Sequence, residues 1–276
     1  MSESSSSASS ASESALRATA AAWLACARAA VIVEVLSHRG SVPRETGTRM
    51  LVATGDGADS TAGTIGGGHL EWQAISHARA GRTTPWSVAL GPSLGQCCGG
   101  ALTLAFVPLS AAALASWPTT PPRLEIELYG AGHVGRAIVQ LLTGLDVRVR
   151  WIDQRDDAFP TAALPSSIEA LCAEPIEAEV AAAPPGACHL VLTHSHDLDL
   201  RLTEAILWRG DFRWLGLIGS ATKRARFMRR LAERGVPADA LARLTCPIGL
   251  PGVGGKAPAE IAIAVVAQLL ALPSEP

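Results

Sequence analysis

The chain has 276 residues, of which 48% are hydrophobic and 17% charged, enough for two folded domains of ordinary size. Its formal net charge of −2 gives no whole-protein field that would attract nucleic acid or an anionic membrane surface. The spacing of its six cysteines fits neither a small disulfide scaffold nor a four-thiolate zinc site, so we expect reduced thiols and a cytoplasmic protein.

The two ends of the chain indicate no targeting or membrane segment. Residues 1–14 are Ser-rich and lack the basic end and apolar centre of a signal peptide, which predicts a disordered tail. The longest apolar stretch, 261–272, is too short to span a bilayer.

Residues 15–107 are predicted to form an N-terminal mixed α/β domain. A helix over 15–30 precedes a strand over 31–36, and further strands are predicted at 49–53, 85–90 and 101–107. The loop 37–48 contains Arg44, which we interpret either as an anion contact or as a solvated charge.

A run of glycines, Gly66, Gly67 and Gly68, stands directly before a helical pattern. Glycines at a helix N-terminus can aim several N–H groups at one phosphate, although they also serve simply as turns. Glu71, in the first turn, is expected either to cap the helix or to meet a ligand hydroxyl or amine.

The stretch 95–100 places Gln96, Cys97 and Cys98 between glycines. Neighbouring side chains on extended backbone point to opposite sides, so Cys97 and Cys98 are not expected to clamp one metal ion together. One thiol could face a ligand while the other packs, and bare glycine backbone would favour a reactive thiolate. The alternative is that two small apolar side chains fill a tight turn.

Residues 108–123 are rich in Ala, Ser, Thr and Pro and are predicted to be a linker, and 124–276 to be a Rossmann-like domain with a mainly parallel sheet. A strand at 124–129 meets the pattern G-x-G-x-x-G and a helix, and a second strand ends at Asp153, where a ribose hydroxyl would be received. This predicts a nucleotide-bearing ligand, unless the fold is kept as a scaffold with its site empty or reused. The candidate residues of this motif are Gly130, Gly132, His133, Gly135 and Asp153.

Polar residues follow the next strand, predicted at 188–192. His194 and His196 could face the same way, and Asp197 or Asp199 could orient one of them, join a metal site or cap the following helix. We expect at least one of these histidines to face a ligand, because ligands collect at the carboxyl ends of parallel strands.

A strand at 214–218 leads to Gly219 and Ser220 at a helix start, where an anion could bind with Lys223 nearby. The later loop 246–256 is similar to a phosphate loop only superficially. Leu250 stands in place of its first glycine and Ala257 in place of its Ser or Thr, which excludes an ATPase.

Seven motifs in order make the chain resemble the XdhC/CoxI family from about residue 31 to 270. No single motif would suffice, but seven in the same order make chance agreement improbable. They lie at 40–44, 66–71, 95–100, 130–135, 193–197, 216–220 and 246–252.

The resemblance implies a carrier of the molybdenum cofactor (molybdopterin) with no turnover of its own. Such a protein holds the cofactor while a cysteine desulfurase helps replace an oxo ligand by sulfide, and delivers it to the molybdenum subunit of apo xanthine dehydrogenase. Cys97 or Cys98 would offer a thiolate to molybdenum, and Arg44 with the glycines 66–68 would contact the pterin phosphate. We also expect a homodimer, and the Rossmann-like half could hold part of the cofactor or a nucleotide such as NAD(P).

Two other functions remain open from the sequence. One is an NAD(P)-dependent oxidoreductase that uses Gly130, Gly132, Gly135 and Asp153, with His194 or His196 as acid–base group. The other is a transferase in which the Cys97 or Cys98 thiol carries sulfur covalently.

Overall fold

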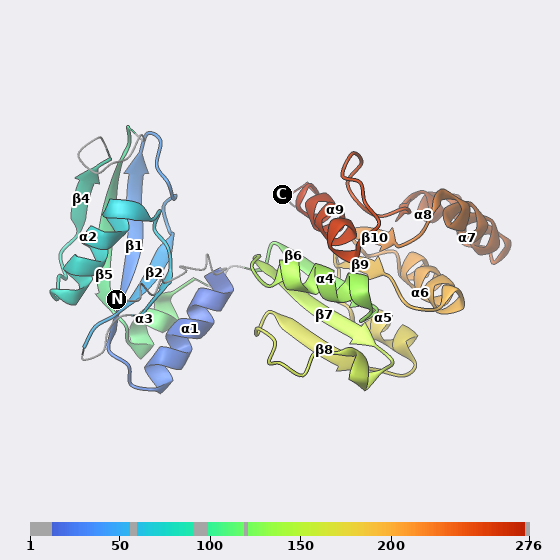
Figure 1. Cartoon of the computed structure of the whole chain (residues 1–276), viewed down its shortest axis with the longest axis horizontal. Helices are drawn as coiled ribbons and strands as arrows, with labels where there is room; N and C mark the ends of the chain where they lie inside the picture. The colour runs from blue at the N-terminus through green and yellow to red at the C-terminus, as the bar shows by residue number, and fades with distance from the viewer. Residues whose placement is uncertain (1–12, 56–59, 91–98, 119–120, 274–276) are drawn as a thin grey trace. The chain divides into compact units, whose positions relative to one another are not determined.

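The computed structural model describes residues 13–55, 60–90, 99–118 and 121–273 (Figure 1). The chain divides into two compact units, with the boundary between Thr120 and Pro121. Each unit has its own sheet and is described separately.

The first unit is built on an antiparallel sheet with strand order β3-β2-β1-β5-β4. The expected mixed α/β domain is therefore confirmed, with its strands all paired antiparallel. The strands are β1 (Ala30–Arg39), β2 (Arg49–Ala53), β3 (Thr61–Gly63), β4 (Trp86–Ala89) and β5 (Ala101–Pro108), and the helices are α1 (Glu13–Ala25), α2 (Gly68–Arg79) and α3 (Ala111–Ser116).

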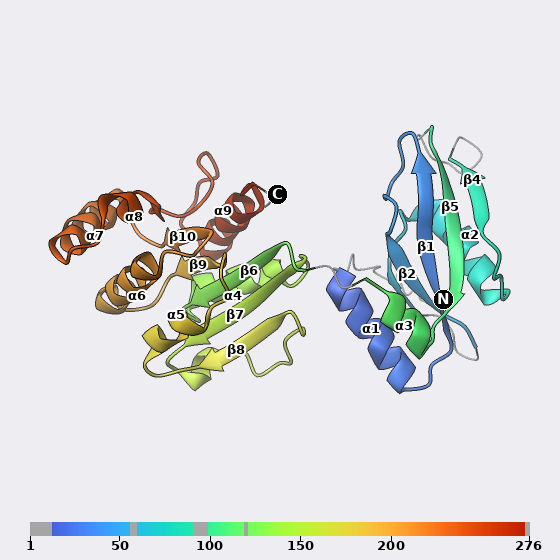
Figure 2. The same cartoon turned by 180° about the vertical axis from the view of Figure 1, so that it is seen from behind.

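The central strand β1 is apolar because both of its faces are covered. Val33 and Val35 pack in the same core as Leu70 of α2, whereas Ile32 packs on the other face with Leu16 of α1. This is the alternation that a two-residue period produces. Figure 2 shows α1 and α3 together on that second face.

Helix α3 lies inside the segment that the sequence analysis assigned to a linker. Ser110 caps its N-terminus, accepting a hydrogen bond from the N–H of Ala113 at 3.1 Å. Trp117, directly after the helix, is 3% exposed and packs with Leu16 and Leu51. The burial of this indole fixes residues 110–117 to the first unit.

The second unit contains a six-stranded parallel sheet in the order β11-β10-β9-β6-β7-β8. This is the strand order of a doubly wound Rossmann sheet and confirms the expected fold. The strands are β6 (Leu124–Tyr129), β7 (Val147–Asp153), β8 (Ile168–Cys172), β9 (Cys188–Val191), β10 (Trp214–Leu217) and β11 (Leu244–Thr245).

Helices cover both faces of this sheet and bury one core on each side. Helices α4 and α9 lie side by side on one face, where Ile138 and Val265 share a core with Leu128 (Figure 1). The remaining helices pack on the other face. The α-helices of this unit are α4 (His133–Leu142), α5 (Glu179–Ala182), α6 (His196–Arg209), α7 (Ala221–Glu233), α8 (Ala238–Ala242) and α9 (Pro258–Leu270).

Within the described part of the chain, no helix combines the length and apolar character that crossing a bilayer requires.

A buried histidine stands in the middle of the parallel sheet. His189 of β9 is 1% exposed, and its ring stacks on Tyr129 of β6 with centroids 5.9 Å apart. Its Nδ1 lies 3.2 Å from the tyrosine hydroxyl. Burial, together with the charge of Arg209, lowers the pKa of His189 to about 4. The ring is therefore neutral in the folded protein at pH 7.

This histidine should make the second unit sensitive to acid. The unfolded chain binds the proton near pH 6.5 and the folded chain only near pH 4, so the contribution of His189 to folding stability rises with pH across that window and is lost as pH falls. The contribution is about 3 kcal/mol. Glu127, whose pKa burial raises to about 7, contributes with the opposite sign. In urea titrations between pH 4 and 7, His189→Asn should flatten this dependence, whereas His196→Asn, an exposed control, should keep it. Equal slopes in wild type and His189→Asn would contradict the assignment.

Candidate functional site

A cavity of about 640 Å³ opens at the carboxyl ends of β6 and β9, where the strand order of the second unit reverses. Ligands bind at this position in open α/β sheets. Five residues predicted from the sequence line it: Gly130, Gly132, His133, Gly135 and His194. The other lining residues were not named as site residues from the sequence, although four of them, Ala131, Val134, Thr193 and Ile218, lie in its motifs. The remaining ones are Arg136, Arg155, Asp157, Ala158 and Leu192.

The three glycines of the G-x-G-x-x-G motif differ in what a side chain at each position would meet. Gly130 has φ +122°, and a Cβ there would stand 2.4 Å from the carbonyl oxygen of Leu192. A Cβ on Gly135 would stand 2.1 Å from the carbonyl oxygen of Gly130. Gly132 has an ordinary extended conformation with φ −74°, and a Cβ there would meet nothing within 4 Å. Packing explains the first and third glycines, whereas the second leaves open space at the cavity wall.

Helix α4 presents its N-terminus to this cavity. The first i→i−4 hydrogen bond of the helix runs from the N–H of Arg136 to the carbonyl oxygen of Gly132, at 2.9 Å. The N–H groups of the residues before Arg136 have no acceptor inside the helix, and they carry the positive end of its dipole. His133 and His194 are both exposed beside this helix start. The arrangement suits an anionic group of a ligand.

Asp153 is not the open acceptor that the sequence suggested. Its side chain is 3% exposed and accepts hydrogen bonds from the N–H of Ala131 at 2.7 Å and of Arg155 at 3.0 Å. The Arg155 guanidinium adds two more at 3.0 Å. Burial raises the pKa of Asp153, but these hydrogen bonds outweigh burial and leave it below its usual value. The expected contact with ribose hydroxyls is corrected to an internal contact with the glycine loop.

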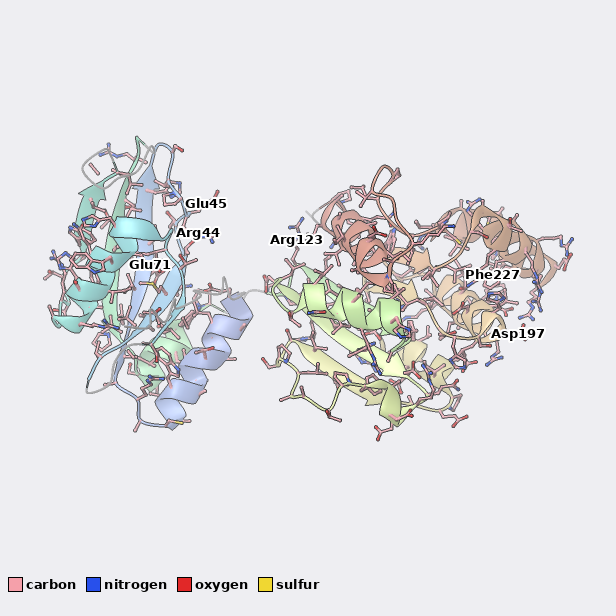
Figure 3. The ribbon with its side chains drawn as sticks, in the orientation of Figure 1. Arg44, Glu45, Glu71, Arg123, Asp197 and Phe227 are labelled. Atoms are coloured by element: carbon pink, nitrogen blue, oxygen red, sulfur yellow. The ribbon has the colours of Figure 1, made fainter. Side chains whose placement is uncertain are left out.

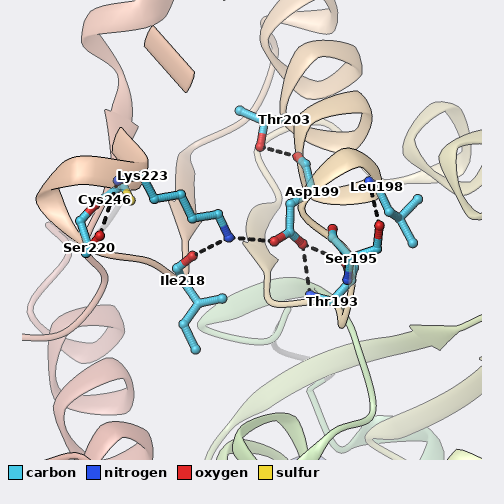
Figure 4. Close-up of polar contacts among 9 residues, drawn as sticks. All are labelled: Thr193, Ser195, Leu198, Asp199, Thr203, Ile218, Ser220, Lys223 and Cys246. Atoms are coloured by element: carbon cyan, nitrogen blue, oxygen red, sulfur yellow. Dashed lines mark hydrogen bonds and ion pairs between the residues drawn. The ribbon is translucent and has the colours of Figure 1, made fainter. Parts of the chain in front are cut away.

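Asp199 and Lys223 form a buried ion pair that joins the ends of two strands (Figure 4). Asp199 accepts from the N–H and the hydroxyl of Thr193 at 3.0 and 2.7 Å, and from Lys223 Nζ at 2.6 Å. Lys223 Nζ also donates to Ile218 O at 2.8 Å. Because Thr193 and Ile218 both line the cavity, this pair fixes part of its wall.

These contacts change the roles predicted for the neighbouring residues. Lys223 is committed to Asp199 rather than being free for a ligand, and Asp199 neither caps α6 nor orients a histidine. Ser195 caps α6, and Ser220 caps α7 by accepting from the N–H of Lys223 at 3.2 Å. Gly219 packs against the side chain of Lys223, whose Cδ would stand 2.6 Å from an added Cβ.

The second predicted histidine lies outside the cavity. His196 is exposed at the first position of α6. Asp197 beside it (Figure 3) forms an ion pair with Arg230 at 3.7 Å. Nowhere in the described ranges do three His, Cys, Asp or Glu side chains gather in a way that could hold a metal ion.

In the first unit, the glycine run holds one of the protein's own carboxylates. Glu71 of α2 accepts from the hydroxyl of Thr64 at 2.6 Å and from the N–H groups of Ile65 and Gly67 at 3.2 and 3.0 Å. The N–H of Gly66 donates to Thr64 Oγ1 at 3.1 Å. Glu71 is therefore the capping group, and the N–H groups of Gly66 and Gly67, expected to bind a phosphate, already have a protein acceptor.

Three predicted motifs of the first unit lie against one another. An added Cβ on Gly66 would stand 2.5 Å from Pro43 Cγ, and one on Gly100 would stand 2.3 Å from Ser41 O. The loop between β1 and β2 therefore contacts both the glycine run and the described end of the 95–100 motif. Arg44 is exposed on this loop next to Glu45 (Figure 3). Gln96, Cys97 and Cys98 lie outside the described residues.

Comparison with known proteins assigns both units to one family. A model of the XdhC Rossmann domain matches residues 126–269, a little over half of the chain, and a model of the XdhC and CoxI family matches residues 23–85. The chain belongs to the XdhC and CoxI family. The family resemblance inferred from the ordered motifs is thereby confirmed.

One relative of this XdhC-family chain and one solved structure illustrate the match. The uncharacterized protein YqeB of Escherichia coli strain K12 is 33% identical over 249 residues, which span 87% of this chain and 42% of YqeB. The crystal structure of a protein of Bacillus halodurans described as a xanthine dehydrogenase superimposes with a TM-score of 0.70 at 19% identity. The superposition covers 93% of this chain and 95% of that protein, so the two share their fold.

The buried ion pair of the XdhC-family cavity should matter far more for stability than an exposed pair on the same helix. Lys223→Met would leave the Asp199 carboxylate, 1% exposed, without its cation and should lower the free energy of unfolding by about 3–5 kcal/mol. Arg229→Met, which breaks the exposed pair with Glu233, should cost less than about 1 kcal/mol. Chemical denaturation followed by circular dichroism measures both. Similar losses in the two variants would show that Lys223 does not hold the wall.

Proposed function

We propose that this chain binds the molybdenum cofactor, holds it while a cysteine desulfurase assists its sulfuration, and delivers it to apo xanthine dehydrogenase. Family membership supports this role, and the observation that carries it is the open glycine loop at the N-terminus of α4. A homodimer in the cytoplasm is part of the same proposal.

The cavity of the second unit fits the phosphate-bearing part of such a cofactor. Its volume of about 640 Å³ lies in the range of small-molecule and cofactor sites. Gly132 contributes no side chain, so a ligand can approach the main chain closely. The unpaired N–H groups at the start of α4 would bind the phosphate, with His133 and His194 beside it.

The metal-bearing part of the cofactor calls for a soft ligand. Cys97 and Cys98 are our candidates, since thiolate is the protein ligand best matched to a soft metal and to sulfur exchange. The bound cofactor would supply the molybdenum centre that the receiving enzyme uses, and this chain would perform no turnover of its own. Arg44 is a further candidate contact, because it is exposed on the loop that touches the described end of the 95–100 motif.

The alternative of an NAD(P)-dependent oxidoreductase loses the ribose acceptor that the sequence predicted for it. Asp153, its expected ribose acceptor, is buried and already accepts four hydrogen bonds. We therefore carry one proposed function forward.

A substitution in the glycine loop can test ligand binding without disturbing the fold. Gly132→Ala adds a methyl group that meets no protein atom within 4 Å, so the variant should fold like wild type. The same methyl group would block a close ligand, so the molybdenum retained after incubation with free cofactor and gel filtration should fall at least about tenfold. Gly144→Ala is the matched control, because its Cβ also meets nothing within 4 Å but lies outside the cavity. If Gly132→Ala retained as much molybdenum as wild type, the cavity would not be the binding site of the cofactor.

The thiols are tested by the same molybdenum assay. Cys97→Ala or Cys98→Ala should lower the retained molybdenum severalfold if one thiolate binds the metal, and we expect the larger loss from Cys97→Ala. Cys26→Ala, which removes an exposed cysteine of the first unit, serves as the control. Wild-type retention by the Cys97→Ala, Cys98→Ala double variant would exclude the thiols as metal ligands.

A further inference from the structure

The far wall of the cavity, at the carboxyl end of β7, is where a Rossmann sheet receives the ribose of a dinucleotide. In this chain Asp153 ends β7, and Arg155 follows two residues later on the cavity wall. The two side chains interact with each other, which changes what the wall can recognise.

Asp153 has no hydrogen-bonding capacity left for a ribose diol. A carboxylate offers about four acceptor positions. Two of those on Asp153 are filled by the backbone N–H groups of Ala131 and Arg155, and two by Nε and Nη2 of the Arg155 guanidinium at 3.0 Å. With 3% of the side chain exposed, no further hydroxyl can reach it.

Arg155 has hydrogen-bond donors that its pair with Asp153 does not use. A guanidinium carries five N–H groups in a fixed plane, and the pair with Asp153 uses two of them. The side chain is 47% exposed and lines the cavity, so the remaining donors are accessible to a ligand there. Asp153 also fixes the orientation of the guanidinium, which lowers the entropy lost when it binds a second anion.

The other charged groups on this wall set the balance. Arg136 donates Nε and Nη2 to Ala158 O at 3.0 and 2.6 Å, and it keeps its positive charge at the wall. Asp157 is the acidic side chain that lines the same wall and opposes an anion. With Asp153 and Asp157 set against Arg155 and Arg136, the charges on this wall balance, and recognition of a phosphate rests on the planar donors of Arg155, which match two phosphate oxygens at once.

We propose that this end of the cavity binds a phosphate monoester and rejects a free ribose diol. Among dinucleotides, the chain would then take one phosphorylated on the adenosine 2′ hydroxyl in preference to the unphosphorylated form. The inference rests on the proposed function only in treating the cavity as a ligand site.

The test compares NADP⁺ and NAD⁺, which differ only in that phosphate, by isothermal titration of the purified full-length chain. Wild type should bind NADP⁺ at least about tenfold more tightly than NAD⁺. Arg155→Gln should weaken NADP⁺ and strengthen NAD⁺, because acceptor positions on Asp153 become free. Arg155→Lys should keep part of the preference, and Arg148→Gln, which changes an exposed arginine of strand β7 outside the cavity, should keep all of it.

Three results would overturn the proposal: equal binding of the two dinucleotides, a preference unchanged in Arg155→Gln, or no binding of either. Circular dichroism of each variant shows whether it is folded. Molybdenum retention by the same preparations separates this proposal from the carrier function. If wild type retains molybdenum but does not prefer NADP⁺, only the phosphate position is refuted. If it prefers NADP⁺ but retains no molybdenum, only the carrier role is refuted.

Discussion

The close contact between the glycine loop and Leu192, the residue that follows strand β9, is the constraint on which the candidate site depends. Gly130 lies so near Leu192, and Gly135 so near Gly130, that a single methyl group at either position would overlap a carbonyl oxygen. This contact lets α4 begin immediately beside the ends of β6 and β9. The helix N-terminus and the two strand ends therefore share one cavity, with Gly132 as the place where the protein leaves room.

A second constraint recurs in both units: buried carboxylates organise the loops from within. Glu71 bonds the N–H groups of its own glycine run, and Asp153 bonds the glycine loop through Ala131. Asp199 bonds Thr193 and pairs with Lys223. Each satisfies donors that would otherwise need water or a ligand. The glycine run and Lys223, which the sequence suggested for ligand anions, therefore already have protein partners.

The two units offer different chemistry to a ligand. In the first, the loop 40–44 packs against the glycine run and against Gly100, which joins three family motifs at one place next to the segment that contains Cys97 and Cys98. In the second, the parallel sheet presents a preformed cavity with an exposed arginine on its far wall.

The sequence alone determined the fold class, the Rossmann strand–loop–helix unit and the family, because these depend on local periodicity and on glycines at fixed spacing. It also located five residues of the cavity wall. The partners of Asp153, Glu71 and Lys223 were decided only by the tertiary structure. The sequence around a charged residue does not distinguish one that faces a ligand from one that faces a buried counter-charge. Only the folded chain brings Asp199 next to Lys223 and Arg155 next to Asp153.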